Sequence, residues 1–327
     1  MHSIDSDAHE IAVSLFPELL EEVAVDQSRI PRLAKDSESM RQIREAIDRL
    51  RTQHLLKEGD ARDLEFIADE SIHLVVTSPP YWTLKEYQEN GAQLGSIESY
   101  DDFANELEKA WIEAHRVLVP GGRLVIVVGD VNVSRRAYGR HLVFPLHATI
   151  QESCRRVGLD NLAPIIWYKI ANAKFEAGGG GFLGKPFEPN GIIKNDVEYI
   201  LMQRKPGGYR KPTLTMRILS TITADEHRNW FQQIWRLPGA STRDHPAPFP
   251  IELSERLIRM FSFVGDTVLD PFVGSGTTSL AAARAGRNSI GVDIEGKYIT
   301  LAEQRLISKL SSFFVNASLE VGRSQTQ

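Results

Sequence analysis

Short apolar runs alternate with amphipathic stretches along most of this chain, and each period predicts a different element. Short segments rich in apolar residues predict β-strands at residues 71–77, 123–128, 162–168, 267–270 and 288–292. Apolar positions at helical spacing predict α-helices at residues 100–119, 143–157, 251–261, 279–285 and 297–310. Strands that alternate with helices indicate a mostly parallel sheet covered on both faces, so we predict an α/β fold.

Two stretches depart from this alternation. Residues 11–54 carry helical spacing, with Ile43, Ile47 and Leu50 on one stripe, and we interpret them as a helical N-terminal extension. Residues 171–244 contain prolines and four consecutive glycines, and they predict an irregular insertion. A flexible linker is one interpretation of the glycines. Recognition by loops carried on a rigid scaffold is the other.

Composition narrows the class of protein. Of the 327 residues, 42% are hydrophobic, and the longest apolar runs fall well short of the ~20 residues of a membrane helix. The N-terminus lacks the basic start and apolar core of a signal peptide, so we expect a cytoplasmic protein without membrane contact. The single cysteine, Cys154, excludes an internal disulfide and a cysteine-built metal site, and no metal is predicted.

The net charge argues mildly against a nucleic-acid partner, but its distribution does not. The formal net charge is −5 and the isoelectric point is about 6.0. Between residues 169 and 244, however, basic residues outnumber acidic ones by 12 to 7. Because phosphate is bound by a local patch, this stretch indicates a partner there.

The turn after the first predicted strand carries the most specific chemistry. Residues Thr77–Trp82 read TSPPYW. Each proline removes a backbone donor and fixes φ at about −65°, so neighbouring carbonyls are left free. These carbonyls, the Ser78 hydroxyl and the flat Tyr81 ring form a rigid pocket with acceptors at its rim, which suits a planar amine. Trp82 either extends the pocket wall or packs in the core.

A second motif predicts a nucleoside site. The strand at 267–270 leads into PFVGSGTT and an alanine-rich helix, where small residues let a ligand approach free backbone amides. A phosphate-binding loop would need lysine where Thr277 stands, and a dinucleotide motif would need a third glycine. The next strand ends at Asp293, where a carboxylate would hold a ribose diol. A nucleoside without phosphates fits, and S-adenosylmethionine is the common example. Upstream, HPAPFP at 245–250 either aims a helix N-terminus at an anion, such as a methionine carboxylate, or is a stiff connector.

In this order, the segments 77–82, 245–250, 270–278 and 291–293 resemble the β-arrangement of the DNA amino-methyltransferases, over about residues 56–306. Enzymes of that family use S-adenosylmethionine to methylate the exocyclic amine of cytosine or adenine. The resemblance implies a Rossmann-like sheet that is circularly permuted, because the catalytic turn precedes the cofactor loop. It divides the chain into a helical extension (1–54), a catalytic half (55–170), a target-recognition insertion (171–244), a cofactor-binding half (245–310) and a C-terminal tail (311–327).

The resemblance also implies roles for individual residues. The catalytic residues are Ser78, Pro79, Pro80 and Tyr81. The cofactor-binding residues are Asp60, Thr77, His245, Pro246, Phe249, Pro250, Asp270, Pro271, Phe272, Gly274, Ser275, Gly276, Thr277, Thr278 and Asp293. The substrate-binding residues are Trp82, Lys174, Lys185 and Lys194. Double-stranded DNA is the implied partner, while a cognate restriction endonuclease and a homodimer are left open.

The predicted chemistry is attack by an aromatic amine whose lone pair is delocalised into the ring. Acceptors beside its two hydrogens favour the change towards a tetrahedral nitrogen, and the base must be flipped out of the duplex. In the family, serine at position 78 is typical of cytosine-N4 enzymes and aspartate of adenine-N6 enzymes. The absence of a Pro-Cys nucleophile argues against methylation at cytosine C5. The alternatives are an adenine-N6 enzyme, a protein or RNA methyltransferase, and a DNA-binding regulator with an inactive site.

Overall fold

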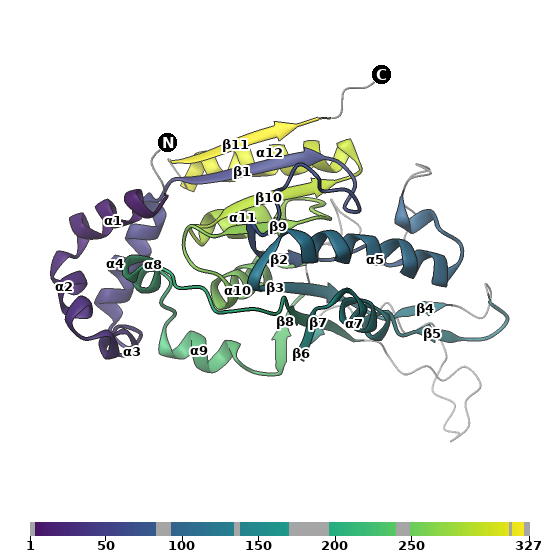
Figure 1. The fold of residues 1–327 in the computed structure, drawn as a ribbon, viewed down its shortest axis with the longest axis horizontal. Helices are drawn as coiled ribbons and strands as arrows, with labels where there is room; N and C mark the ends of the chain where they lie inside the picture. The colour runs from purple at the N-terminus through teal and green to yellow at the C-terminus, as the bar shows by residue number, and fades with distance from the viewer. Residues whose placement is uncertain are drawn as a thin grey trace.

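The computed structural model describes residues 4–82, 93–133, 138–169, 196–239, 249–313 and 316–323. Within them, nine strands form one sheet in the order β11-β1-β10-β9-β2-β3-β7-β6-β8 (Figure 1). Pairing is parallel from β11 to β3, β7 runs antiparallel to β3 and β6, and β8 is parallel to β6. The strands are β1 (Thr52–Glu58), β2 (Ile72–Thr77), β3 (Leu118–Val128), β6 (Asp160–Lys169), β7 (Val197–Arg204), β8 (Ile234–Leu237), β9 (Thr267–Asp270), β10 (Asn288–Asp293) and β11 (Ala317–Gly322). A separate antiparallel pair consists of β4 (Val131–Val133) and β5 (Leu142–Phe144).

Helices cover both faces of the sheet because its central strands are apolar on both sides. Along β2, Val75 packs with the helices α5 and α7, whereas Leu74 and Val76 pack with α10 and α11. The covering helices are α5 (Tyr100–Val117), α7 (Leu146–Val157), α10 (Ile251–Phe261), α11 (Thr277–Arg284) and α12 (Gly296–Phe313). The predicted α/β fold with a largely parallel sheet is therefore confirmed.

The N-terminal helices form a layer of their own at one end of the sheet (Figure 1). They share an apolar cluster with the helix α8. Ile43 and Leu50 of the predicted stripe are buried within this cluster. The helices are α1 (Ile4–Leu15), α2 (Pro17–Val25), α3 (Ile30–Leu33), α4 (Ser37–Arg49) and α8 (Leu214–Leu219). Asp36 precedes helix α4 and caps it, because its carboxylate accepts the Ser39 amide at 2.8 Å.

Residues 52–54, expected in the helical extension, begin β1, and residues 143–144, expected to be helical, belong to β5. Two longer regions also differ from the sequence prediction. The stretch expected to be irregular contributes β7, β8, α8 and α9 (Ala224–Trp230), and β7 lies between β3 and β6 in the main sheet. The expectation of irregular structure is therefore wrong for residues 196–239. The predicted C-terminal tail contains β11, which extends the sheet by pairing with β1. The polar and basic residues around β7 and β11 obscured the apolar residues of these two strands.

The carboxyl ends of β1, β10, β9, β2 and β3 lie at one edge of the sheet, because these strands are parallel. Thr77, Asp270 and Asp293 each end a strand at this edge. In open α/β sheets, ligands bind at this edge. Cys154 lies in the core, where burial raises the pKa of its thiol, as expected of a structural cysteine. Every helix that the structure describes is too short or too polar to span a bilayer.

Candidate active site

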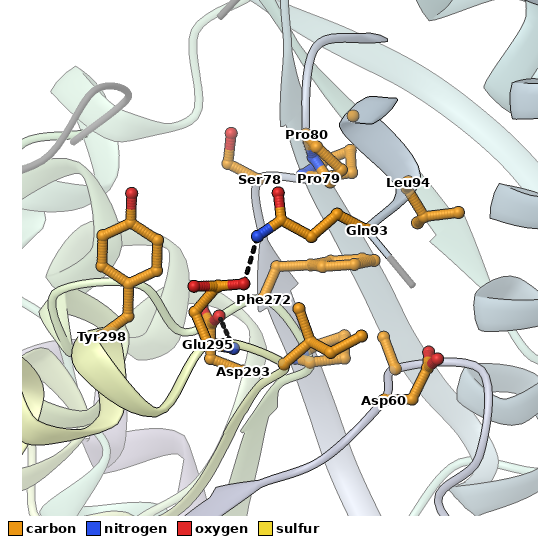
Figure 2. A pocket seen from close by; sticks show the side chains of 14 residues that line it. Asp60, Ser78, Pro79, Pro80, Gln93, Leu94, Phe272, Asp293, Glu295 and Tyr298 are labelled. Atoms are coloured by element: carbon orange, nitrogen blue, oxygen red, sulfur yellow. Dashed lines mark hydrogen bonds between the residues drawn. The ribbon is translucent and has the colours of Figure 1, made fainter. Parts of the chain in front are cut away.

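A pocket opens at the carboxyl edge of the sheet (Figure 2). The catalytic turn and the cofactor loop, nearly 200 residues apart in the chain, form two of its walls. Its lining residues are Asp60, Ala61, Ser78, Pro79, Pro80, Gln93, Leu94, Gly95, Pro271, Phe272, Asp293, Ile294, Glu295 and Tyr298. Seven of them were predicted as site residues: Asp60, Ser78, Pro79, Pro80, Pro271, Phe272 and Asp293.

A buried carboxylate joins the two motifs behind the pocket wall. Asp270 accepts hydrogen bonds from the hydroxyls of Thr77 at 2.6 Å and Thr278 at 2.7 Å, and from the Phe272 amide at 3.1 Å. Complete burial raises the pKa of Asp270 to about 6, although these hydrogen bonds oppose the shift. Thr77, Asp270 and Thr278 therefore hold the end of β2 against the cofactor loop, and none of them lines the pocket.

The cofactor loop reaches helix α11 through a left-handed turn at Gly276, which has φ of +76°. A Cβ there would lie 2.9 Å from a methyl carbon of Leu306 and 3.0 Å from Cβ of Ala302, so only glycine fits. Arg305 fixes the turn by donating to Oγ of Ser275 at 3.0 Å and to Oγ1 of Thr277 at 2.9 Å. These two hydrogen bonds hold the loop against α12.

Asp293 ends β10 and fastens the loop to the neighbouring strand. One carboxylate oxygen accepts the Gly274 amide at 2.9 Å, and the other accepts the Glu295 amide at 3.0 Å. Burial raises the pKa of Asp293 to about 6 against these hydrogen bonds. Asp60, on the turn after β1, lies at another side of the pocket and accepts from Arg62, whose Nη2 is 2.6 Å from Oδ2.

Sequence reasoning missed the residues that close the pocket between the two halves. The Gln93 amide nitrogen donates to Glu295, as Figure 2 shows. The Gln93 side-chain oxygen is buried and has no hydrogen-bond partner among the described residues. Tyr298, at the start of α12, adds an aromatic wall. Glu295 lies two residues after the predicted Asp293. This closeness in the sequence was a signal from which Glu295 could have been predicted as a site residue.

The charges of the pocket select among ligands. Asp60, Asp293 and Glu295 contribute three acidic side chains, and the described lining contains no lysine or arginine. Asp60 is paired with Arg62, and Glu295 lies 3.6 Å from Lys297, so these two cations outside the lining offset part of the negative charge. A ligand with positive charge is favoured there, and a phosphate group is not. The described side chains also include no cluster of three or more His, Cys, Asp or Glu that could hold a metal ion.

The catalytic turn presents Ser78 and Pro79 to the pocket, while the aromatic residues after them turn away from it. Tyr81 is 8% exposed and Trp82 is 1% exposed, and both belong to the core cluster. The indole nitrogen of Trp82 donates to the Ile97 carbonyl at 2.8 Å. Trp82 therefore packs in the core, which is the second of the two interpretations of its sequence position, and it presents no surface to a substrate here.

The remaining predicted residues fall into two groups. Phe249 packs in the core and Pro250 caps α10, so neither lines the pocket. His245, Pro246, Lys174, Lys185 and Lys194 lie outside the described residues. Within the described part of the basic stretch, Arg204 pairs with Asp160, Arg210 with Asp266 and Lys169 with Glu198. Part of the positive charge counted there is thus neutralised within the fold.

The parallel sheet, the glycine turn and the pocket at the carboxyl ends of the strands are features that S-adenosylmethionine-dependent methyltransferases share. The family model described as DNA methylase, for N6- and N4-specific enzymes, matches residues 72–304, and the chain belongs to this family. The chain is 38% identical over 284 residues to the Type II methyltransferase M.MjaI of Methanocaldococcus jannaschii, covering 78% of this chain and 91% of the relative. It is 35% identical over 280 residues to M.MthZI of Methanothermobacter thermautotrophicus, covering 79% and 77%.

Solved structures share the fold. The protein TTHA0409 of Thermus thermophilus, described as a DNA modification methylase and complexed with S-adenosyl-L-methionine, matches with a TM-score of 0.69 and 52% identity, over 84% of this chain and 100% of that one. The cytosine-N4-specific PvuII DNA methyltransferase matches with a TM-score of 0.57 and 20% identity, over 84% and 96%. The second likeness is one of fold alone.

Proposed function

We propose that the protein methylates N4 of cytosine within a specific sequence of double-stranded DNA. Its family makes it a DNA amino-methyltransferase. The observation that carries the choice of cytosine is Ser78 beside Pro79 in the pocket wall, since serine at this position is typical of N4 enzymes in the family. Because the relatives are named Type II methyltransferases, we also propose that it protects its site from a cognate restriction endonuclease.

S-adenosyl-L-methionine is the cofactor, and when bound it supplies an electrophilic methyl group. The residues present fit this molecule. The acidic lining contributed by Asp60, Asp293 and Glu295 suits its sulfonium and amino charges. The unpartnered Gln93 oxygen is a buried acceptor that an N–H or O–H of the ligand would satisfy. Phe272 provides a flat apolar surface for a purine ring.

The chain's own contribution to the reaction is to hold and polarise the amine. The Ser78 hydroxyl oxygen and the Pro79 carbonyl each accept one hydrogen of the flipped base's amino group. Both acceptors are fixed beforehand, because consecutive prolines follow Ser78 and the Thr77 hydroxyl is bound to Asp270. Acceptors that stabilise the attacking nitrogen more as its lone pair leaves the ring lower the barrier.

Mass spectrometry of nucleosides tests the target base. Unmethylated DNA incubated with the protein and S-adenosylmethionine should yield N4-methylcytosine at one recurring sequence. N6-methyladenine as the sole product would overturn the choice of base, and no methylated nucleoside would overturn the activity itself. Ser78→Ala should lower the rate by about 10²-fold or more. Ser71→Ala, at the opposite end of β2, is the matched control and should leave the rate unchanged.

A further inference from the structure

The order of strands separates two sides of the catalytic turn. β9 and β10, which carry the cofactor loop and Asp293, lie on one side of β2, and β3 and β7 lie on the other. The amine attacks the methyl carbon from the side opposite the sulfur of the cofactor. With the cofactor on the side of β9 and β10, the target base has to enter from the side of β3 and β7. The residues at this end of β3, β7 and β6 are therefore placed to read the base. This step rests on the proposed function.

Two oppositely charged side chains meet at this place. Lys169 is the last residue of β6, and its ammonium group pairs with the carboxylate of Glu198 near the start of β7. The ammonium also lies 4.9 Å from the centre of the Trp167 ring. The two side chains are 25% and 14% exposed, so they are largely withdrawn from water but still accessible.

Gly129 brings this ion pair next to the catalytic turn. A Cβ on Gly129 would lie 3.3 Å from Cγ of Glu198 and 3.4 Å from Cε1 of Tyr81. Glu198 and Tyr81 thus both approach Gly129, which has no side chain and directly follows β3. The ion pair therefore stands beside the ring that ends the Ser78–Tyr81 turn.

The chemistry of the base edge defines what this pair can do. In cytosine and adenine, the amino group stands next to a ring nitrogen that accepts a hydrogen bond, whereas thymine presents a carbonyl next to a ring N–H. Ser78 and Pro79 supply the acceptors for the amine, so the next position requires a donor. A lysine ammonium has three donors and no acceptor. We propose that Lys169, held by Glu198, donates to the ring nitrogen beside the target amine and thereby admits cytosine or adenine and rejects thymine.

A purely structural brace between β6 and β7 is the competing explanation. The same two strands carry another ion pair, Arg204 with Asp160, at the opposite edge of the sheet. That pair lies at the end of the strands far from the catalytic turn, so it cannot contact the target base. Arg204→Met is therefore a control that removes one positive charge from the same two strands.

A cycle of enzyme variants and base analogues separates the two explanations. The rate constant kcat/KM is measured for wild type and Lys169→Met on DNA carrying either cytosine or 3-deazacytosine at the methylated position. The analogue replaces the ring nitrogen by C–H. On cytosine, Lys169→Met should lose about 10- to 100-fold, the usual cost of a hydrogen bond from a charged group. On the analogue, wild type and Lys169→Met should be equally slow, because the same interaction is already absent.

Other outcomes overturn the proposal separately from the function. An equal loss for Lys169→Met on both bases would identify a brace, and an unchanged rate on cytosine would remove Lys169 from recognition. Wild type alone is decisive if the variant does not fold: equal rates on cytosine and on the analogue would mean that no group reads the ring nitrogen. Calorimetric binding of S-adenosylmethionine should be unaffected in Lys169→Met. Failure of wild type to methylate DNA would refute the proposed function instead.

Discussion

At the scale of single residues, Asp270 is a buried carboxylate that joins the two motifs of the site. Its carboxylate is buried, holds the end of β2 through Thr77 and holds the cofactor loop through Thr278. Burial raises its pKa to about 6 from an ordinary value of 3.8. The folded state therefore binds a proton on Asp270 more tightly than the unfolded state does. As a result, the contribution of Asp270 to stability depends on pH.

Asp270→Asn should change how stability depends on pH. Because the folded pKa is raised, the group's contribution to stability is fully present below about pH 4 and is lost as the pH rises through 6. The free energy of unfolding of wild type relative to the variant should fall by up to roughly 3 kcal/mol between pH 4 and pH 7. Urea denaturation at both pH values measures this difference, and identical pH slopes in the two proteins would contradict it.

Gly291→Ala should disturb the cofactor site through packing alone. A Cβ at this position would lie 2.5 Å from Cγ2 of Val273 in the cofactor loop. The loop has to shift, which costs about 1–3 kcal/mol and weakens cofactor binding. Thermal unfolding and calorimetry measure the two effects. Gly208→Ala is the control, because a Cβ there meets nothing within 4 Å, and a similar loss in both variants would refute the packing argument.

The sequence predicted those site residues whose chemistry depends on a local pattern. Ser78 to Pro80, Phe272 and Asp293 stand in motifs whose spacing follows from one strand and one turn, and the structure brings them to one pocket. Gln93 could not be found in this way, because its place in the pocket depends on tertiary packing against Glu295. The packing of Trp82 likewise depended on an Ile97 carbonyl 15 residues away.

At the scale of elements, the sequence predicted the strands β2, β3, β6, β9 and β10 but not β1, β7, β8 or β11. Strands β2 and β9 are continuous apolar runs, because both of their faces are buried. The edge strand β11 packs only one face, so its six residues alternate in exposure and resemble a polar tail. In β7, the apolar run Tyr199–Met202 was a usable signal that the surrounding basic composition obscured.

The packed face of β11 gives a prediction at this scale. Leu319 contacts the apolar clusters formed with α12 and β1, whereas Ser318 points to solvent from the same strand. Leu319→Ala should lower the free energy of unfolding by about 1–2 kcal/mol, since the side chain is only partly buried. Ser318→Ala should change it by less than about 0.5 kcal/mol. Chemical denaturation compares them, and equal effects would mean that β11 contributes little packing.

At the scale of the whole molecule, the pocket couples cofactor binding to stability. A ligand that binds only the folded state stabilises it by about 2.7 kcal/mol at a hundredfold excess over Kd. Asp293→Ala removes the acceptor that holds Gly274 beside the pocket, so S-adenosylmethionine should raise its melting temperature less than that of wild type. Ser78→Ala should keep the full shift while methylating slowly. A full shift in Asp293→Ala would exclude this residue from cofactor binding.

The position of β1 between β10 and β11 determines how late in synthesis the sheet can be completed. His54 of β1 hydrogen-bonds Ser289 of β10, a residue 235 positions later in the chain. On the ribosome, β1 and one side of β2 therefore wait without partners until residues 267–293 have been translated, which favours slow folding and recruitment of chaperones. A prematurely terminated product lacks the strand that carries Asp293. Such a product leaves the edges of β1 and β2 unpaired, which favours aggregation.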